Sequence, residues 1–154
     1  MKNYTIYTDG ACSKNPGRGG YAFVILEDGR KIYEGSGAVP DTTNNRMELM
    51  AAIRAAETII DLVGNKEIAH AVVISDSKYV VDGINRWIHG WLQRGWENKE
   101  GGPVKNSDLW LRLYTKTNDE AVSVSFEFLW MRGHQGDEWN DYVDNLAVEA
   151  VKCI

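Results

Sequence analysis

The feature that most constrains the fold is a series of three strand-like segments before the first helix-like segment. Residues 3–9 alternate aromatic or aliphatic side chains with threonine, which is typical of a strand with one buried face. A strongly apolar run over 19–28 follows, and an Asp-Gly turn signal leads from it into a third run over 31–39. Because short turns join neighbouring antiparallel strands, these residues predict an antiparallel meander.

Helices and strands alternate in the rest of the chain. Segment 44–64 is rich in helix-forming residues and ends at Gly64, as a helix should. The further predicted elements are a strand over 69–75, a short helix over 76–85, an irregular stretch over 86–106, a helix over 107–119, a strand over 122–131 and a helix over 137–152. This order predicts an α/β fold with one five-stranded mixed sheet flanked by helices. We expect a single domain over residues 1–154, since the chain shows neither a linker nor an internal repeat.

Composition restricts the class of protein. The net charge of −5 argues against indiscriminate nucleic-acid binding, although it leaves room for a local basic face. No apolar run approaches the roughly 18 residues of a membrane span, and the first residues lack the apolar core of a signal peptide. We therefore expect a cytoplasmic protein. Two cysteines, Cys12 and Cys153, make neither a disulfide framework nor a metal-ligand set, so we interpret them as reduced thiols.

Two aspartates stand at the ends of strand-like segments. Asp9 ends the first predicted strand and Asp76 follows the fourth. If the fourth strand pairs with the first, the order of strands changes direction between them. Ligands bind open α/β sheets at such a point, beyond the carboxyl ends of the strands. The sequence thus predicts a crevice that holds two carboxylates.

Each candidate carboxylate also has a structural interpretation. Asp9 precedes a glycine and can form a turn, and Asp76 can cap the following helix. Glu48 stands three residues after Asn45, at the spacing of a capping box. Asp144 lies beside the apolar stripe of the last predicted helix, where it can border the core. When each carboxylate is considered by itself, the functional interpretation is preferred to the structural one only for Asp9.

The helix face that carries Glu48 changes this balance. The same face carries Ala52, Ala55 and Ile59, so it is small, apolar and suited to close packing. A carboxylate placed there has to be paired or bound to a metal. Oxygen ligands suit Mg²⁺ or Mn²⁺, and the sequence contains no Cys/His set for zinc.

Seven motifs together resemble those of bacterial type 1 ribonuclease H (ribonuclease HI). They are YTDGAC, NPGRGG, TTNNRMELMAAI, SDSKYV, RWIHGW, GWENKEGGPVKNSDLWLRL and RGHQGDEWNDYVDNLA, in the family's order over about residues 3–151. The resemblance implies a ribonuclease H-like fold. It also implies a metal-dependent endonuclease that hydrolyses the RNA strand of RNA/DNA hybrids and leaves 5′-phosphate and 3′-hydroxyl ends.

The resemblance assigns catalytic roles to five residues. The family's four metal-binding carboxylates correspond to Asp9, Glu48, Asp76 and Asp144. Two Mg²⁺ ions, with Mn²⁺ as a substitute, would lie about 3.5–4 Å apart and stabilise the entering and leaving oxygens. His134 matches the family's loop histidine, which implies an assisting role in proton transfer or product release; without the resemblance it is an ordinary surface histidine.

The resemblance also implies contacts to the RNA strand. Asn15, Asn44 and Asn45, with backbone near Cys12, correspond to the residues that detect 2′-hydroxyl groups. Side-chain amides both donate and accept hydrogen bonds, which suits a hydroxyl group that does the same. Turn formation at Asn15 and helix capping at Asn45 are the structural alternatives.

The DNA strand is expected to contact a handle-like protrusion at about 86–106, which includes Trp87. This stretch has four basic and two acidic residues, a net charge of +2 in an acidic chain. Thr43 and Asn106 match the family's phosphate-binding threonine and asparagine. Asp41 stands where some relatives place an arginine, so we expect weaker and more salt-sensitive hybrid binding than in relatives with a more basic handle.

Two alternative functions would explain part of these observations. A nuclease of the same fold acting on another nucleic acid would leave the TTNN motif and the handle unexplained. A hybrid-binding module without catalysis would leave the full carboxylate set unexplained. We therefore expect a monomeric ribonuclease H that binds RNA/DNA hybrid and needs no membrane and no protein partner.

Overall fold

The computed structural model describes residues 1–133 and 136–154, and in this part of the chain five strands form one mixed sheet. The strands are β1 (Lys2–Cys12), β2 (Gly17–Glu27), β3 (Arg30–Thr42), β4 (Ala69–Ser75) and β5 (Val124–Trp130). Their order is β3-β2-β1-β4-β5, with an antiparallel meander over the first three strands and parallel pairing of β1 with β4 and of β4 with β5. The predicted α/β class and the predicted pairing of the first and fourth strands are confirmed.

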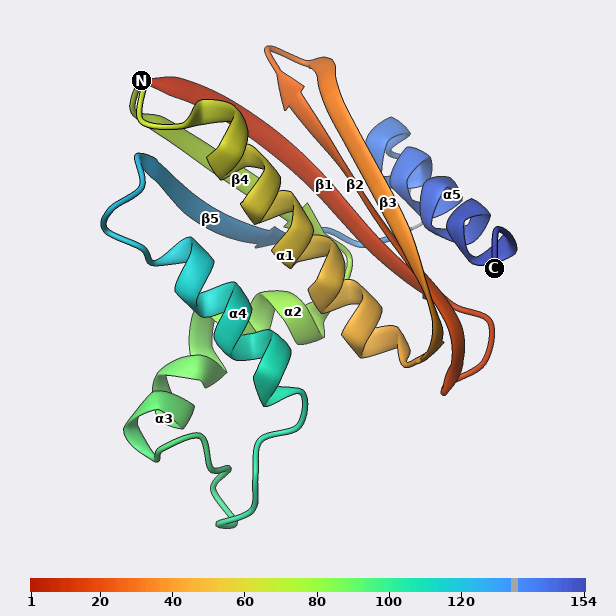
Figure 1. The fold of residues 1–154 in the computed structure, drawn as a ribbon, viewed down its shortest axis with the longest axis vertical. Helices are drawn as coiled ribbons and strands as arrows, with labels where there is room; N and C mark the ends of the chain where they lie inside the picture. Colours follow the sequence, from red (N-terminus) through yellow and green to blue (C-terminus); the bar gives the residue numbers. More distant parts are fainter. Residues whose placement is uncertain (134–135) are drawn as a thin grey trace.

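Helices cover both faces of the sheet (Figure 1). They are α1 (Asn44–Val63), α2 (Lys78–Asp82), the π-helical turn η1 (Gly83–Trp87), α3 (Ile88–Gln93), α4 (Ser107–Thr117) and α5 (Glu138–Lys152). Helix α1 packs on β1 and β2 with α4 beside it, whereas α5 packs on β1, β2 and β3 from the opposite face. Helix α3 and the loop after it extend away from the sheet. No helix in the described residues is long and apolar enough to cross a membrane.

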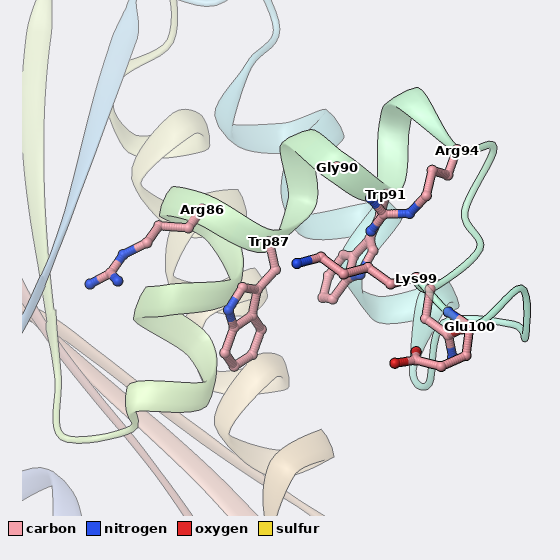
Figure 2. A pocket seen from close by; sticks show the side chains of 8 residues that line it. Arg86, Trp87, Gly90, Trp91, Arg94, Lys99 and Glu100 are labelled. Atoms are coloured by element: carbon pink, nitrogen blue, oxygen red, sulfur yellow. Dashed lines mark hydrogen bonds between the residues drawn. The ribbon is translucent and has the colours of Figure 1, made fainter.

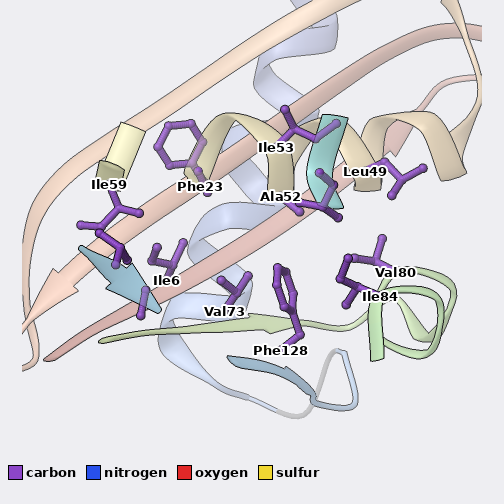
Figure 3. Close-up of a cluster of buried hydrophobic side chains, with 14 of the residues drawn as sticks. Ile6, Phe23, Leu49, Ala52, Ile53, Ile59, Val73, Val80, Ile84 and Phe128 are labelled. Carbon is purple, nitrogen blue, oxygen red and sulfur yellow. The ribbon is translucent and has the colours of Figure 1, made fainter. Parts of the chain in front are cut away.

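The main core lies between the sheet and α1 (Figure 3). Ile6 and Val73 from the sheet meet Leu49 and Ile53 from α1, and all four are fully buried. The face of α1 that contains Ala52, Ala55 and Ile59 is fully buried too, as its small residues predicted. The cost of burying the carboxylate of Glu48 on this face must therefore be balanced at the site itself.

The start of α1 differs from the predicted capping box. The helix is capped by Thr43, whose hydroxyl accepts a hydrogen bond from the backbone N–H of Arg46 at 3.3 Å. Asn45 lies inside the first turn, so neither its capping role nor a capping box with Glu48 is present. Both structural alternatives were wrong because they placed the N-cap at Asn45 and not at Thr43, although the helix start predicted at residue 44 is correct.

The predicted irregular stretch over 86–106 is wrong in its first part. Residues 83–93 are helical, and only the segment after Gln93 is irregular. Gly83, inside the predicted helix over 76–85, is a packing residue: a Cβ atom there would lie 2.0 Å from the ring of the buried Trp110. Glycine is therefore needed for close approach at this position and does not end the helix.

Candidate active site

Asp9 lies where β1 loses its neighbour on one side. The last residue pair between β1 and β4 is Thr8 with Ser75, so Asp9 is the first residue beyond the carboxyl end of β4. Strand β1 continues to Cys12 along β2, so the prediction that Asp9 ends its strand was wrong. Its interpretation as a turn residue is wrong for the same reason. The buried carboxylate instead occupies the predicted crevice at the carboxyl end of β4.

Glu48 reaches this position because α1 touches β1 at Gly10. A Cβ atom on Gly10 would lie 2.5 Å from the backbone nitrogen of Glu48 and 2.6 Å from the carbonyl carbon of Met47. Only glycine permits this contact between the helix and the strand. It brings the buried side chain of Glu48 beside that of Asp9.

Asp76 completes a compact group of three carboxylates. Ligand oxygens of Asp9, Glu48 and Asp76 all lie within 4.8 Å of one another. The residue that caps α2 is Ser77, whose hydroxyl accepts from the Val80 N–H at 3.2 Å, so the capping interpretation of Asp76 is wrong. The carboxylates of Asp9, Glu48 and Asp76 therefore form one cluster.

Asp144 joins the group from the opposite face of the sheet. It lies on α5, half-buried, and is outside the set of three whose oxygens lie within 4.8 Å. Its carboxyl group is close enough to Asp9 for a hydrogen bond between the two side chains that raises the pKa of Asp9. The fourth predicted carboxylate thus borders the other three.

Burial and like charge make this cluster unfavourable without a cation. Burial raises the pKa of Asp9 well above its usual range, and the negative charges of Glu48 and Asp76 raise it further. Burial also raises the pKa of Glu48, and the charge of Asp76 acts in the same direction. In addition, the buried Oε1 of Glu48 has no hydrogen-bond partner within the described part of the chain. An all-oxygen set with an unpartnered buried acceptor fits a hard divalent cation.

Four of the residues predicted to contact substrate line one cavity at the start of α1, the helix that carries Glu48. Its lining comprises Asn15, Thr43, Asn45, Lys105 and Asn106. The side-chain oxygen of Asn15 accepts a hydrogen bond from the backbone N–H of Asn44 at 3.1 Å, which ties the loop before β2 to the start of α1. Lys105, one of the four basic residues counted in the stretch 86–106, lies in this cavity beside Asn106.

Asn106 is held in place by residues that the sequence analysis did not single out. Its side-chain oxygen accepts from the Arg46 guanidinium at 3.1 Å, and its amide nitrogen donates to the Tyr79 hydroxyl at 3.0 Å. Arg46 in turn forms a two-pronged ion pair with Asp108, at 3.0 and 2.8 Å. Because its rotamer is fixed from both ends, Asn106 presents its backbone and side chain to the cavity in one orientation.

Cys12 is the last residue of β1, before the loop that carries Asn15. Its thiol is close to the backbone oxygens of Lys14 at 2.6 Å and Thr42 at 3.5 Å, and it lines a separate, mostly apolar cavity with Val151. The thiol therefore packs against the protein and not against the predicted substrate cavity. Both cysteines are unpaired thiols, as predicted.

Trp87 lies in a third cavity, on the projecting part of the molecule (Figure 2). It is 42% exposed and packs at 6.2 Å between ring centroids against Trp91. The same cavity is lined by Arg86, Arg94 and Lys99. An exposed aromatic ring among cations is suited to contact a nucleic-acid strand. By contrast, Trp110 is fully buried and belongs to the core.

His134 lies outside the described residues, so its assisting role stays a prediction.

Comparison with known proteins identifies the family. A family model described as RNase H matches residues 1–152. The chain is 45% identical over 150 residues to a ribonuclease H of Novosphingobium aromaticivorans, covering 97% of both chains. It is 47% identical over 148 residues to a ribonuclease H of Alcanivorax borkumensis, covering 96% of this chain and 90% of that one.

Solved structures agree with the sequence relatives. LC9-RNase H1, a type 1 RNase H with the type 2 active-site motif, superposes with a TM-score of 0.84 at 32% identity, over 99% of this chain and 74% of that one. LC11-RNase H1, solved in complex with RNA/DNA hybrid, superposes with a TM-score of 0.74 at 25% identity over 97% of both chains. The predicted fold, enzyme class and bacterial type 1 resemblance are confirmed, and the chain belongs to the ribonuclease H family.

Proposed function

We propose that this ribonuclease H hydrolyses the RNA strand of RNA/DNA hybrids at the carboxylate cluster, with two divalent cations, and leaves 5′-phosphate and 3′-hydroxyl ends. The observation that carries the proposal is the convergence of Asp9, Glu48 and Asp76 within 4.8 Å, next to a cavity lined by asparagines. The hybrid bound to the similar LC11-RNase H1 supports the choice of substrate.

The chain would hold the cations through Asp9, Glu48, Asp76 and Asp144. Mg²⁺ is the proposed ion and Mn²⁺ the substitute, because both prefer oxygen ligands. When bound, such ions stabilise charge on the entering and leaving oxygens and lower the pKa of the attacking water. The protein's own part is to hold four carboxylates close together, which the contact at Gly10 and the end of β4 achieve. His134 is proposed to assist proton transfer or product release.

The cavity beside the cluster is proposed to distinguish RNA from DNA. The 2′-hydroxyl is the local difference between the two strands, and amide groups both donate to it and accept from it. Asn15, Asn44 and Asn45, with backbone near Cys12, would supply these contacts. Asn15 and Asn44 are already joined by a hydrogen bond, so this part of the recognition surface is preformed.

The DNA strand is proposed to lie on Thr43, Asn106 and the handle-like protrusion at 86–106, with Trp87 as its aromatic contact. In the described part of the chain, no carboxylate pairs with Arg94 or Lys99, whereas Arg86 pairs with Asp82 at 3.4 Å. Unpaired cations are free to neutralise phosphate. The chain would act as a monomeric cytoplasmic domain, and sedimentation analysis of the purified protein tests the monomeric state.

Replacing Lys105 with glutamine is expected to weaken hybrid binding mainly through charge. Lys105 lines the cavity with Thr43 and Asn106, so its ammonium group would neutralise one DNA phosphate. The slope of log affinity against log salt concentration is negative, and loss of one phosphate contact makes it shallower by about 1. Fluorescence anisotropy of a labelled hybrid over a salt series measures this slope. The exposed Lys116, on α4, provides the matched control K116Q, and equal slopes for K105Q and K116Q would contradict the placement.

A panel of duplexes tests the proposed function. The purified protein is incubated with Mg²⁺ and end-labelled RNA/DNA, RNA/RNA and DNA/DNA duplexes of one sequence. We expect cleavage of the RNA strand of the hybrid alone. Binding of the hybrid without cleavage would favour the non-catalytic binding module, and cleavage of all three duplexes would favour a same-fold nuclease of broader substrate range.

A further inference from the structure

The end of β5 packs directly against the segment that carries Asp76. The backbone N–H of Met131 donates to the Ser75 carbonyl at 3.0 Å. The indole N–H of Trp130 donates to the carbonyl oxygen of Asp76 at 2.9 Å. A Cβ atom on Gly133 would lie 2.6 Å from the Asp76 carboxylate, so the backbone there approaches the carboxylate closely. The segment from Trp130 to Gly133 therefore packs against Ser75 and Asp76, with Gly133 next to the Asp76 carboxylate.

Trp130 also contacts the first residue of α2. The ammonium nitrogen of Lys78 lies 4.6 Å from the centroid of the Trp130 ring, within the range of a cation–π interaction. Lys78 is exposed, and no ion pair to it is found within residues 1–133 and 136–154. It stands two residues after Asp76. A cation without an ion pair among these residues is thus held by an aromatic ring, two residues after Asp76 in the chain.

Two separate groups of one side chain make these contacts. The indole N–H bonds the backbone of Asp76, while the ring faces the Lys78 ammonium, and 39% of Trp130 remains exposed. A residue that only covered the core would need neither contact. Groups that fix the orientation of a metal ligand commonly control metal affinity without touching the metal.

We propose that Trp130 is a positioning residue, which holds the Asp76 backbone through its N–H and holds the Lys78 ammonium at the rim of the cluster through its ring, where Lys78 neutralises a phosphate of the bound strand. This inference rests on the proposed function, since it assigns Asp76 to metal and Lys78 to nucleic acid. The indole N–H of Trp130 would thus affect metal affinity, whereas its ring would affect hybrid binding through Lys78.

Three variants separate these effects. Trp130→Phe removes the N–H but keeps a ring beneath Lys78, so we expect the Mg²⁺ concentration for half-maximal cleavage to rise about 10–100-fold. Stabilisation of the free protein by Mg²⁺ gives a second measurement, made without substrate. The Mg²⁺ concentration that produces half of the full rise in melting temperature should increase by a similar factor. Lys78→Gln should leave both metal titrations unchanged. It should make the slope of log hybrid affinity against log salt concentration shallower by about 1. Trp130→Leu should show both changes.

Leu129→Ala is the matched control. Leu129 precedes Trp130 on β5 and is 45% exposed, so this variant perturbs the same strand end without touching Asp76 or Lys78. It should match the wild type in metal titration and salt slope. An unchanged metal titration in W130F, beside a wild type that responds to Mg²⁺, would overturn this inference alone. A wild type that neither responds to Mg²⁺ nor cleaves hybrid would overturn the proposed function together with it.

Discussion

Replacing Asp9 with asparagine is expected to abolish hybrid cleavage while making the metal-free protein more stable. The two effects have one cause. Asp9 is buried beside Glu48 and Asp76, and burial together with their charges raises its pKa. Asparagine keeps the shape but carries no charge, so the folded state is relieved of an electrostatic cost. The same change removes a metal ligand, which is worth several kcal/mol of transition-state stabilisation and about 10³-fold or more in rate.

The sign of the stability effect depends on pH in a defined way. A carboxyl group whose pKa is raised on folding binds protons more readily in the folded state, so it destabilises the folded protein at neutral pH and not below the ordinary pKa of aspartate. The gain in D9N should therefore be present at pH 7 and disappear in acid. Thermal unfolding in a metal chelator measures it, at about 2–4 °C for each kcal/mol in a chain of this size.

Asp61→Asn is the control for D9N. Asp61 is exposed on α1, so this variant should match the wild type both in melting temperature and in cleavage. A D9N variant that is less stable than the wild type without metal would contradict the electrostatic account. Residual cleavage above about one tenth of the wild-type rate would contradict the ligand role of Asp9.

Replacing Gly10 with alanine is expected to damage both fold and activity. The added Cβ atom would meet backbone atoms of Met47 and Glu48 at 2.6 and 2.5 Å, and backbone cannot rotate away as a side chain can. Helix α1 must therefore shift away from β1, at a cost of about 1–3 kcal/mol. Because Glu48 lies at this contact, the shift moves one carboxylate relative to the other two.

Gly35→Ala separates these two consequences. A Cβ atom there would lie 2.5 Å from the ring of the buried Phe23, a clash at the same distance but with a core side chain, on β3 and away from the carboxylates. Both variants should lose stability in urea unfolding, but G35A should cleave hybrid at the wild-type rate below its melting temperature. G10A should cleave at least about tenfold more slowly, as expected when catalytic groups are displaced by about 1 Å. Equal activity of the two folded variants would contradict the account.

Much of this architecture follows from local patterns. The small apolar face of α1 predicted a closely packed helix, and the strand over 69–75 was predicted with the bounds that the structure shows. Strand ends predicted the crevice with Asp9 and Asp76, and the apolar helix face singled out Glu48, whereas the metal role of Asp144 came only from the resemblance. Asp9 was placed in the right crevice for a partly wrong reason, because β1 continues past it along β2.

Other features depend on contacts between distant residues. The close approach of Gly83 to Trp110 joins residues that are 27 positions apart in the chain. The support of Asn106 by Arg46 and Tyr79 has the same character, as has the bond from Trp130 to Asp76. No local pattern predicts such pairs, because periodicity reports which face is buried and not what is buried against it.

The central claim is that the carboxylate cluster is a metal site that cleaves RNA in a hybrid. The most direct test is a Mg²⁺ titration of cleavage of a hybrid with a 5′-labelled RNA strand, with analysis of the product ends. We predict no cleavage in chelator, cleavage that rises with Mg²⁺, an intact DNA strand, and fragments that end in 3′-hydroxyl groups. Cleavage that persists in chelator, or fragments that end in 2′,3′-cyclic phosphate, would contradict the account.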